Sequence, residues 1–483
     1  MQKSLLKNII YKVLLNLFNL ILPILVGPYV YRTLGASSIG KVQFSESIFN
    51  YFFIFAVFGV YQYGMREMSL IKNDKQKVNK LFTSLFTISF VTSISSLLIY
   101  LSFSYIGYGD NIIFPILLIY GINFIGSIFY VEWVNEAFEN YDFITIKTII
   151  IRIFYVIFLF ILIKGSDDYH QYAWLLVLST FLNNIISFIY VKRRLQFDFQ
   201  NINIIKHIKP LFLVVIFSNA NILYTQLDRY MLGQYVSTKA VSYYAMGQQI
   251  MSIIHMLMLS IIQVTIPRLS HLSGAQDDTS YIRLLDTISK LYLCFLFPAS
   301  VGLYIVSDVG VYIYGGKEFM NTGNVLSIFS IYMISLGIES ILANQVIYVK
   351  KGESMLVKLI FICGFFNLLL NILLVNMNIL SPSSAIVTTT IANFSLFTME
   401  YIYIKKKLNV NFNLFELSKM KYGLYSLVFI PISYLIRLYI FKPIPLFISL
   451  VSVNMAVYLL ILFITKDEIL HMFLNKIRSK FNR

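Results

Sequence analysis

Charged residues are scarce in this sequence: Asp, Glu, Lys and Arg together make up 13% of its 483 residues. Soluble globular domains carry about a quarter of their residues as charges. Hydrophobic residues make up 58% of the chain instead, and the mean hydropathy is +0.73. A soluble fold is therefore excluded, and apolar runs of about 20 residues, long enough to cross a bilayer as helices, recur along the chain.

Cysteine and nucleotide-binding motifs are scarce or absent as well. The two cysteines, Cys294 and Cys363, lie far apart in apolar segments and favour buried thiols over a disulfide framework or a thiolate metal site. No H-E-x-x-H, C-x-x-C, G-x-x-x-x-G-K-[ST] or G-x-S-x-G motif occurs in a usable context. We therefore expect no enzyme, no cofactor and no ATP-driven pump; the energy would come from an H+ or Na+ gradient, the membrane potential or consumption of the product.

The apolar runs predict an all-α polytopic membrane protein. A span must satisfy its own backbone hydrogen bonds, and these runs are too long and too continuously apolar for barrel strands. Hydropathy predicts fourteen helices, at roughly 9–31, 40–63, 82–104, 112–133, 146–163, 172–191, 210–232, 240–262, 286–306, 323–343, 357–377, 384–404, 421–440 and 444–464.

The distribution of basic residues predicts the orientation. With a cytoplasmic N-terminus, the inner segments hold 29 of the 39 basic residues, the outer segments hold six, and four lie in or near spans. This bias follows the positive-inside rule and places both termini in the cytoplasm. It also explains the net charge of +16 without a nucleic-acid partner. Residues 192–209 and 466–483 are predicted to be amphipathic helices on the membrane surface, with an ordinary linker and tail as the alternative.

An internal repeat predicts the domain organisation. YRTLGASSIGKVQF, residues 31–44, and RYMLGQYVSTKAVSYY, residues 229–244, both run from an apolar span through a basic residue into Leu-Gly. Six spans separate the copies, so they have the same orientation, and parallel repeats build transporters with a central site between two halves. The predicted parts are two six-helix halves around a central cleft (1–207 and 208–405), helices 13 and 14 (406–465) and a cytoplasmic amphipathic tail (466–483).

These two regions, extended to LPILVGPYVYRTLGASSIGKVQF and TQLDRYMLGQYVSTKAVSYYAMGQQI, resemble the polysaccharide transporter family, the Wzx-type flippases of the multidrug/oligosaccharidyl-lipid/polysaccharide exporter superfamily. The resemblance implies a fourteen-helix V-shaped bundle in the bacterial cytoplasmic membrane that works by alternating access. It also implies the substrate, an undecaprenyl-diphosphate-linked oligosaccharide repeat unit, which moves from the inner to the outer leaflet for capsule or exopolysaccharide assembly. Membrane lipids, a polysaccharide polymerase and glycosyltransferases are the expected partners.

Such a substrate requires cations for the diphosphate, preferably arginine, whose planar fork pairs with phosphate oxygens. Arg32 follows Pro23 and Pro28 at the outer end of the first span, where a broken helix could aim it into a lumen; the alternative is an interfacial arginine. Arg152 lies within the fifth span, where an unpaired arginine costs on the order of 3 kcal/mol or more, so it is expected to face the bundle interior. Lys290 begins the ninth span and could contact substrate, but snorkelling is favoured.

Polar faces suited to glycans occur on the second and eighth spans. Gln43 shares a helix face with Glu46, and Tyr244 shares one with Gln248. The two faces are expected to meet across the cleft; the alternative is hydrogen bonding between helices of one half.

Asp228 and Arg229 are adjacent charges near the outer end of the seventh span. Neighbouring helical residues point about 100° apart, so we expect Asp228 to make a structural contact and Arg229 to face the substrate path. The alternative is that both are interfacial and merely end the span.

Acidic residues inside other spans have separate expectations. Glu132 and Glu136 are expected to pair with Arg66 or Lys147 rather than bind a coupling ion. In the C-terminal half, Glu339 and Glu400 are single acids in apolar surroundings and are candidate proton or sodium sites.

Three other functions remain open. An ion-coupled multidrug exporter shares the superfamily fold but typically has twelve spans and an acidic lumen. The sequence distinguishes poorly between an oligosaccharide flippase and a flippase for a peptidoglycan or teichoic precursor. A membrane glycosyltransferase or polymerase usually carries a large outer loop, which this sequence lacks. The intramembrane arginines favour an anionic substrate.

Overall fold

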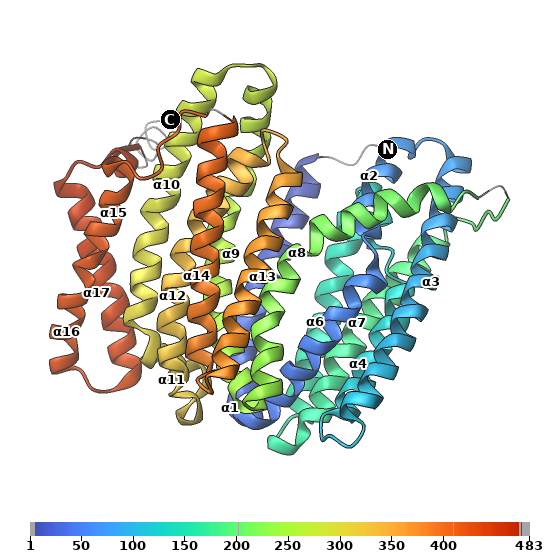
Figure 1. Ribbon diagram of the computed structural model, residues 1–483, viewed down its shortest axis with the longest axis horizontal. Coiled ribbons are helices and arrows are strands. Elements are labelled where there is room, and N and C mark those ends of the chain that lie inside the picture. The colour runs from blue at the N-terminus through green and yellow to red at the C-terminus, as the bar shows by residue number, and fades with distance from the viewer. Residues whose placement is uncertain (1–4, 201, 409, 473–474, 476–483) are drawn as a thin grey trace. The chain divides into compact units, whose positions relative to one another are not determined.

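The computed structural model describes residues 5–200, 202–408, 410–472 and 475, and within these residues its regular structure is entirely helical (Figure 1). This confirms the predicted all-α class. The contacts divide the chain into two compact units, unit 1 (Met1–Ser242) and unit 2 (Tyr243–Arg483).

Unit 1 is a bundle of long helices joined by short turns. Its elements are α1 (Leu5–Val57), α2 (Val60–Ile71), α3 (Lys75–Tyr108), α4 (Phe114–Ile128), α5 (Glu132–Ala137), α6 (Tyr141–Leu162), η1 (Ser166–Asp168), α7 (Tyr169–Lys192), α8 (Ile205–Tyr235) and the start of α9 (Thr238–Gly274).

Unit 2 continues α9 and has the same construction. Its further elements are α10 (Asp278–Ile305), α11 (Ser307–Gly315), η2 (Lys317–Phe319), α12 (Thr322–Ile341), η3 (Leu342–Ile347), α13 (Glu353–Asn376), α14 (Pro382–Tyr403), η4 (Ile404–Leu408), α15 (Leu417–Leu427), α16 (Phe429–Tyr439) and α17 (Pro443–Ile464).

Each predicted span overlaps a helix of the structure, although the ends differ in places, by twelve residues at the end of α9. Within the described residues, eleven segments are long and apolar enough to cross a membrane. Further helices of spanning length are α8, α14 and the second part of α1. The total of fourteen crossings stays a prediction. Large apolar side chains are exposed along α6 and α17, as on Phe154 and Met455, which is the surface that a lipid environment stabilises.

The long helix α1 is two helices joined at Gly35, whose φ of 72° and ψ of 171° are not helical. Only glycine adopts such a backbone without strain. The helix passes through Pro23 and Pro28 without another break, so the expectation that these prolines break the helix ahead of Arg32 is wrong. The change of direction comes three residues after Arg32, not before it.

The amphipathic helix predicted for residues 192–209 is not formed: residues 195–199 and 202–204 have no regular structure. The segment is held against α3, where the side chains of Asn79 and Thr83 accept hydrogen bonds from the backbone N–H groups of Gln196 and Asp198, at 3.2 and 2.8 Å. Phe197 stacks on a buried aromatic ring of α3, with 5.4 Å between ring centroids. These tertiary contacts replace the hydrogen bonds that a helix would supply.

The predicted tail and domain boundaries are only partly covered. Residues 473–474 and 476–483, which hold much of the amphipathic helix predicted for 466–483, lie outside the described residues. The contact-based division falls after Ser242 because α8 packs against α1. The repeat-based halves divide between residues 207 and 208, within the first turn of α8, and they stay a prediction.

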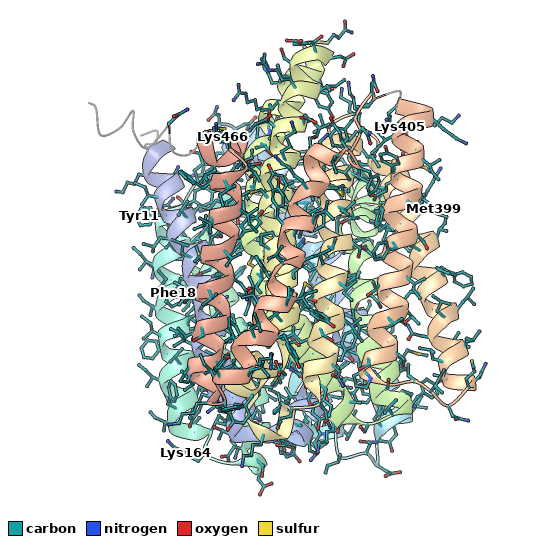
Figure 2. The ribbon with its side chains drawn as sticks, turned by 90° about the vertical axis from the view of Figure 1, so that its left-hand side faces the viewer. Tyr11, Phe18, Lys164, Met399, Lys405 and Lys466 are labelled. Carbon is teal, nitrogen blue, oxygen red and sulfur yellow. The ribbon has the colours of Figure 1, made fainter. Side chains whose placement is uncertain are left out.

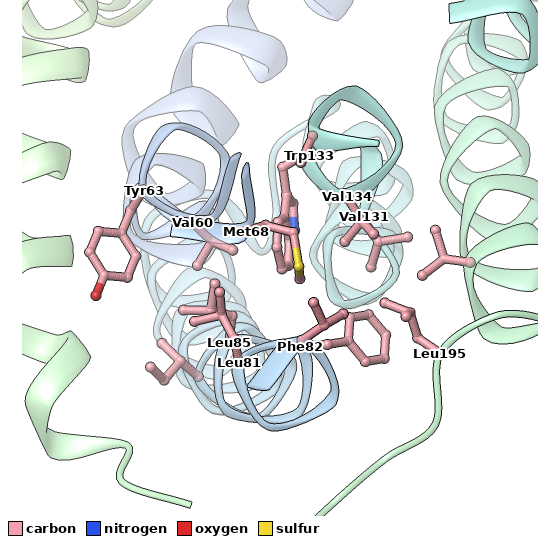
Figure 3. Packing of buried hydrophobic residues seen from close by; sticks show 14 of the residues in the cluster. Val60, Tyr63, Met68, Leu81, Phe82, Leu85, Val131, Trp133, Val134 and Leu195 are labelled. Carbon is pink, nitrogen blue, oxygen red and sulfur yellow. The ribbon is translucent and has the colours of Figure 1, made fainter. Parts of the chain in front are cut away.

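An apolar core stabilises unit 1 where α2, α3 and α5 meet (Figure 3). Met68, Phe82 and Trp133 are almost completely buried there. Gly64 allows the indole ring to approach, because a Cβ at this position would lie 2.7 Å from the Trp133 ring.

Labelled residues in Figure 2 show where several chain segments lie within each unit. In unit 1, Tyr11 and Lys164 lie at opposite ends of the bundle, and in unit 2, Lys405 and Lys466 lie at one and the same end. This arrangement agrees with the predicted sides of these loops, although the orientation itself stays a prediction.

The last helices are tied to the rest of unit 2 by Arg437 of α16, which donates to both carboxylate oxygens of Asp308 at 2.7 and 2.8 Å. Burial would raise the pKa of Asp308, but the hydrogen bonds from Arg437 outweigh it and hold the pKa below its usual range.

Candidate functional site

The second part of α1 and the end of α8 approach each other closely in unit 1. Gly40 lies directly against the backbone of Thr238, and Gly233 lies directly against the ring of Phe44, so neither glycine has room for a Cβ. The two glycines of the Leu-Gly repeat therefore have different roles. Gly35 breaks a helix, whereas Gly233 allows close helix packing.

This close packing brings Glu46 of α1 next to Arg229 of α8. The guanidinium Nη1 and the carboxylate Oε2 are 3.6 Å apart, and the side chains are 14% exposed for Arg229 and 41% exposed for Glu46. The Nε of Arg229 is buried and has no hydrogen-bond partner among the described residues. Arg229 thus has a donor to offer to an anion in addition to the one near Glu46.

Asp228, the neighbour of Arg229, is completely buried. It lies within electrostatic range of the Tyr51 hydroxyl on α1. The two adjacent charges therefore have different surroundings, with Asp228 inside a helix contact and Arg229 partly accessible. The burial of Asp228 agrees with its expected structural contact. That Arg229 faces the substrate path stays a prediction.

Tyrosines and a second arginine surround the Glu46–Arg229 pair. We define the inner polar cluster as the following side chains of α1, α4, α6, α7 and α8, which are linked to one another by hydrogen bonds or electrostatic interactions: Tyr31, Gln43, Glu46, Tyr120, Arg152, Tyr155, Tyr172 and Arg229.

The tyrosines connect the elements of the inner polar cluster. Gln43 Nε2 donates to the Tyr31 hydroxyl at 2.8 Å. Tyr120 is 4% exposed and interacts electrostatically with both members of the Glu46–Arg229 pair. The hydroxyl groups of Tyr155 and Tyr172 interact with each other. Aromatic rings with hydroxyl groups in one place suit the apolar faces and hydroxyl rim of a sugar.

Arg152 differs from Arg229 because no acidic side chain of the described residues pairs with Arg152. It is half-buried on α6, and its one electrostatic contact is with Tyr155, one turn further along the helix. An unpaired cation within a membrane span is costly and marks a functional position. Arg152 and Arg229 therefore supply positive charge in the interior of one unit, as the sequence predicts for Arg152.

The remaining candidates lie elsewhere. Arg32 is exposed near the end of the first helix of α1, three residues before Gly35. In unit 2, Tyr244 is 1% exposed and packs edge-on against Phe329 at 5.1 Å, and Gln248 is half-buried. The meeting of the Gln43 and Tyr244 faces across a cleft involves both units and stays a prediction.

Lys290 belongs to an ion-pair network within unit 2. Its ammonium lies 3.2 Å from Asp286 and 3.6 Å from Glu468. Asp286 also pairs with the buried Lys419 of α15 at 2.5 Å. The network joins α10 to α15 and to the segment after α17, so the surroundings of Lys290 favour a structural role over substrate contact.

The expected pairing of Glu132 with Lys147 is confirmed. Lys147 Nζ lies 3.0 Å from each carboxylate oxygen of Glu132 and also donates to Ser187. The second acid, Glu136, accepts a hydrogen bond from Tyr61 at 2.7 Å. Within the described residues Glu136 forms no ion pair with Arg66 or Lys147, so the expected pairing is found for Glu132 alone.

Unit 2 contains an apolar groove between α10, α16 and α17, with a volume of about 530 Å³. Phe295 and Gly302 of α10, Phe429 of α16, and Met455 and Leu459 of α17 are among its lining residues. An apolar groove on a membrane protein suits a hydrocarbon chain.

Four tyrosines of the inner polar cluster were not predicted as site residues from the sequence: Tyr31, Tyr120, Tyr155 and Tyr172. With 35 tyrosines in the chain, tyrosine itself carries no signal. One signal was available: Tyr155 follows Arg152 by three residues and shares its helix face.

A family model described as "Polysaccharide biosynthesis protein" matches residues 5–273, more than half of the chain. The chain belongs to this family. The match includes every residue of the inner polar cluster.

Two relatives that share one description are similar to this chain over most of their length. A Shigella dysenteriae protein described as "Putative O-antigen transporter" is 24% identical over 366 residues, which are 74% of this chain and 89% of the relative. An Escherichia coli strain K12 protein with the same description is 21% identical over 76% of this chain and 89% of the relative. This polysaccharide biosynthesis family member is accordingly a multi-pass protein of the bacterial inner membrane.

Solved transporter structures share the fold. The lipid II flippase MurJ in an inward closed conformation superposes with a TM-score of 0.74 at 17% identity, covering 95% of this chain and 100% of that one. An inward-facing multidrug resistance MATE family transporter of the MOP superfamily gives a TM-score of 0.62 at 13% identity, with 82% and 94% covered. At these identities the likeness establishes the fold alone.

Proposed function

We propose that this protein is a flippase that moves lipid-linked oligosaccharides, built on undecaprenyl diphosphate, from the inner to the outer leaflet by alternating access. The observation that carries the proposal is the inner polar cluster, in which two arginines lie among tyrosines inside the membrane-spanning part of unit 1. Family membership and the O-antigen transporter relatives support it.

The arginines fit the diphosphate. Arg152 has no acidic partner among the described residues, and the Nε of Arg229 is unpartnered. A phosphate oxygen would satisfy both and would compete with Glu46 for Arg229, whose contact of 3.6 Å is longer than a charge-assisted hydrogen bond. Arg229 can therefore release Glu46 when an anion binds.

The tyrosines and the apolar groove fit the rest of the substrate. Tyr120, Tyr155 and Tyr172 offer rings and hydroxyl groups to sugars. The groove between α10 and α17 offers a hydrocarbon surface to part of a prenyl chain. Each feature, taken by itself within its unit, suits part of an anionic glycolipid better than a small cationic drug.

Capsule or exopolysaccharide assembly is the expected destination, with a polymerase and glycosyltransferases as pathway partners. These partners are the enzymes that the chemistry requires, because repeat units must be built on the inner leaflet and joined after transport.

Deleting the gene while the glycan pathway stays intact tests the function. Lipid-linked repeat units are expected to accumulate on the cytoplasmic leaflet, and surface polysaccharide is expected to be lost. Normal surface polysaccharide in the deletion strain would refute the proposal.

Complementation with arginine variants tests the site. Arg152→Ala and Arg229→Ala are each expected to lower transport about tenfold or more, since a hydrogen bond to a charged group contributes about 1.5–3 kcal/mol. Arg66→Ala is the matched control, because Arg66 is 65% exposed and pairs with its neighbour Glu67. Full activity of both variants, with normal amounts of protein in the membrane, would remove the role of these arginines in phosphate binding.

A further inference from the structure

Two carboxyl groups interact inside unit 2, one from α12 and one from α14. Glu400 of α14 is completely buried, and neither of its carboxylate oxygens has a hydrogen-bond partner among the described residues. It interacts electrostatically with Glu339 of α12, which is half-buried. A buried carboxylate without a partner is costly, so this arrangement requires a bound cation or a proton.

The backbone around both glutamates has the same unusual feature. The π-helix η3 begins three residues after Glu339, and the π-helix η4 begins four residues after Glu400. Helices α12 and α14, which carry the two glutamates, pack against each other, and η3 also contacts α14. Turns of π-helix within helices occur frequently at functional sites.

Other buried polar groups near the pair also lack partners among the described residues. Tyr292 of α10 is completely buried, its hydroxyl has no hydrogen-bond partner, and it interacts electrostatically with Glu339. Asn393 is 2% exposed, has an unpartnered Oδ1 and lies seven residues before Glu400, on the same face of α14. Such groups in a native structure call for a ligand or an exchangeable proton.

Within the described residues, no basic side chain forms an ion pair with either glutamate. The titratable groups that face the pair are Tyr292 from α10 and Cys363 from α13. The nearest lysines along α14 are in η4 and are exposed at residues 405–407, where Lys405 packs over the Tyr401 ring. The other charged groups of α10 and α11 are Asp286 and Lys290, which pair with each other, Asp308, which pairs with Arg437, Asp278, which pairs with Lys350, and the exposed Arg283 near the start of α10.

We propose that Glu339 and Glu400 form a proton-binding pair, in which the buried Glu400 stays protonated and the half-buried Glu339 gains and loses one proton. Uptake forms one O–H bond on the Glu339 carboxylate, and release breaks that bond and leaves the carboxylate. No other bond changes. A link between this proton and substrate movement rests on the proposed flippase function, whereas proton binding itself does not.

A proton fits the pair better than a metal ion. Within the described residues, no group of three or more His, Cys, Asp or Glu side chains could hold a metal. A single carboxyl group can hold a proton by itself, whereas a metal ion needs several ligands.

Infrared difference spectroscopy of the purified full chain in detergent tests the proton site without any substrate. Raising the pH is expected to convert a carboxylic acid C=O band into carboxylate bands, and Glu339→Gln is expected to abolish this conversion. Glu400→Gln is expected to remove a second carboxylic acid band that does not respond to pH. Where one variant fails to fold, the other still tests its own glutamate.

Glu353→Gln is the matched control, because this carboxyl lies in the first turn of α13 and is not fully buried. Its spectrum is expected to keep the pH response. A pH response retained in Glu339→Gln would overturn the proposal. A response to NaCl at constant pH that Glu339→Gln abolishes would replace the proton with sodium and would also overturn it.

Transport in vesicles with an imposed pH gradient then separates the two proposals. Glu339→Gln is expected to transport at a rate that no longer depends on the gradient, while the unmodified protein responds to it. If the infrared response is present but neither protein transports lipid-linked sugar, the flippase function fails and the proton site stands.

Discussion

Lys147 illustrates how one buried cation depends on its partners. Its side chain is 3% exposed and contacts Glu132, which is 12% exposed, and the Ser187 hydroxyl. The attraction within such a pair adds little to stability, but removing one member costs much stability because it leaves the other charge buried and unpaired. The same reasoning makes Arg152 a candidate functional residue, since it remains in a span without an acidic partner among the described residues.

Lys147→Met is expected to destabilise the protein by about 3 kcal/mol or more, because it leaves the Glu132 carboxylate buried and uncompensated. Thermal unfolding in detergent measures the loss. Lys72→Met is the control, since Lys72 and Glu139 are 41% and 46% exposed and such a pair contributes about 1 kcal/mol or less. The double variant Lys147→Met, Glu132→Leu is expected to regain most of the stability; no recovery would contradict the explanation.

Helices in this molecule are shaped at a few positions where backbone or packing demands glycine. Gly35 changes the direction of α1. Gly40 and Gly233 allow α1 to pack closely against the end of α8 and the start of α9. A few other glycines face open space, so larger side chains can be introduced there without a clash. Gly302 of α10 and Gly107 of α3 are two such positions, since nothing lies within 4 Å of a Cβ built on either.

Gly302→Phe is expected to fill the groove between α10 and α17 and to lower transport several-fold, because the ring occupies the apolar surface proposed for the prenyl chain. Surface polysaccharide in a complemented deletion strain is the measurement. Gly107→Phe, which adds the same ring outside the groove, is expected to transport normally. Equal activity of both variants would exclude the groove from the substrate path.

The sidedness of the whole molecule is predicted by its charges and can be measured directly. Cys294 and Cys363 are both buried, so background labelling of the intact protein is low. An impermeant thiol reagent added outside the cell is expected to label Lys164→Cys and Lys317→Cys but not Lys405→Cys or Lys466→Cys. Labelling of all four from outside, or of the last two alone, would reverse or refute the orientation.

The sequence predicted much at the level of elements and little at the level of contacts. The ranges of the helices, the all-α class and the Glu132–Lys147 pair follow from hydropathy and from the cost of isolated charges, which act on consecutive residues. The helix predicted for the linker is absent because the backbone N–H groups of Gln196 and Asp198 find hydrogen-bond partners on α3, more than a hundred residues earlier in the chain. Such partners leave no mark on local periodicity.

For this protein, the sequence alone determined that the chain spans the membrane, because a lipid environment acts on each apolar run separately. It also determined which loops carry positive charge. Only the tertiary structure decided that Arg229 contacts Glu46, that Tyr120 and Tyr172 join them, and that Glu339 meets Glu400. Helix propensity and hydropathy are the same whichever neighbour a helix face meets, whereas these contacts depend on which helices pack together and at what rotation.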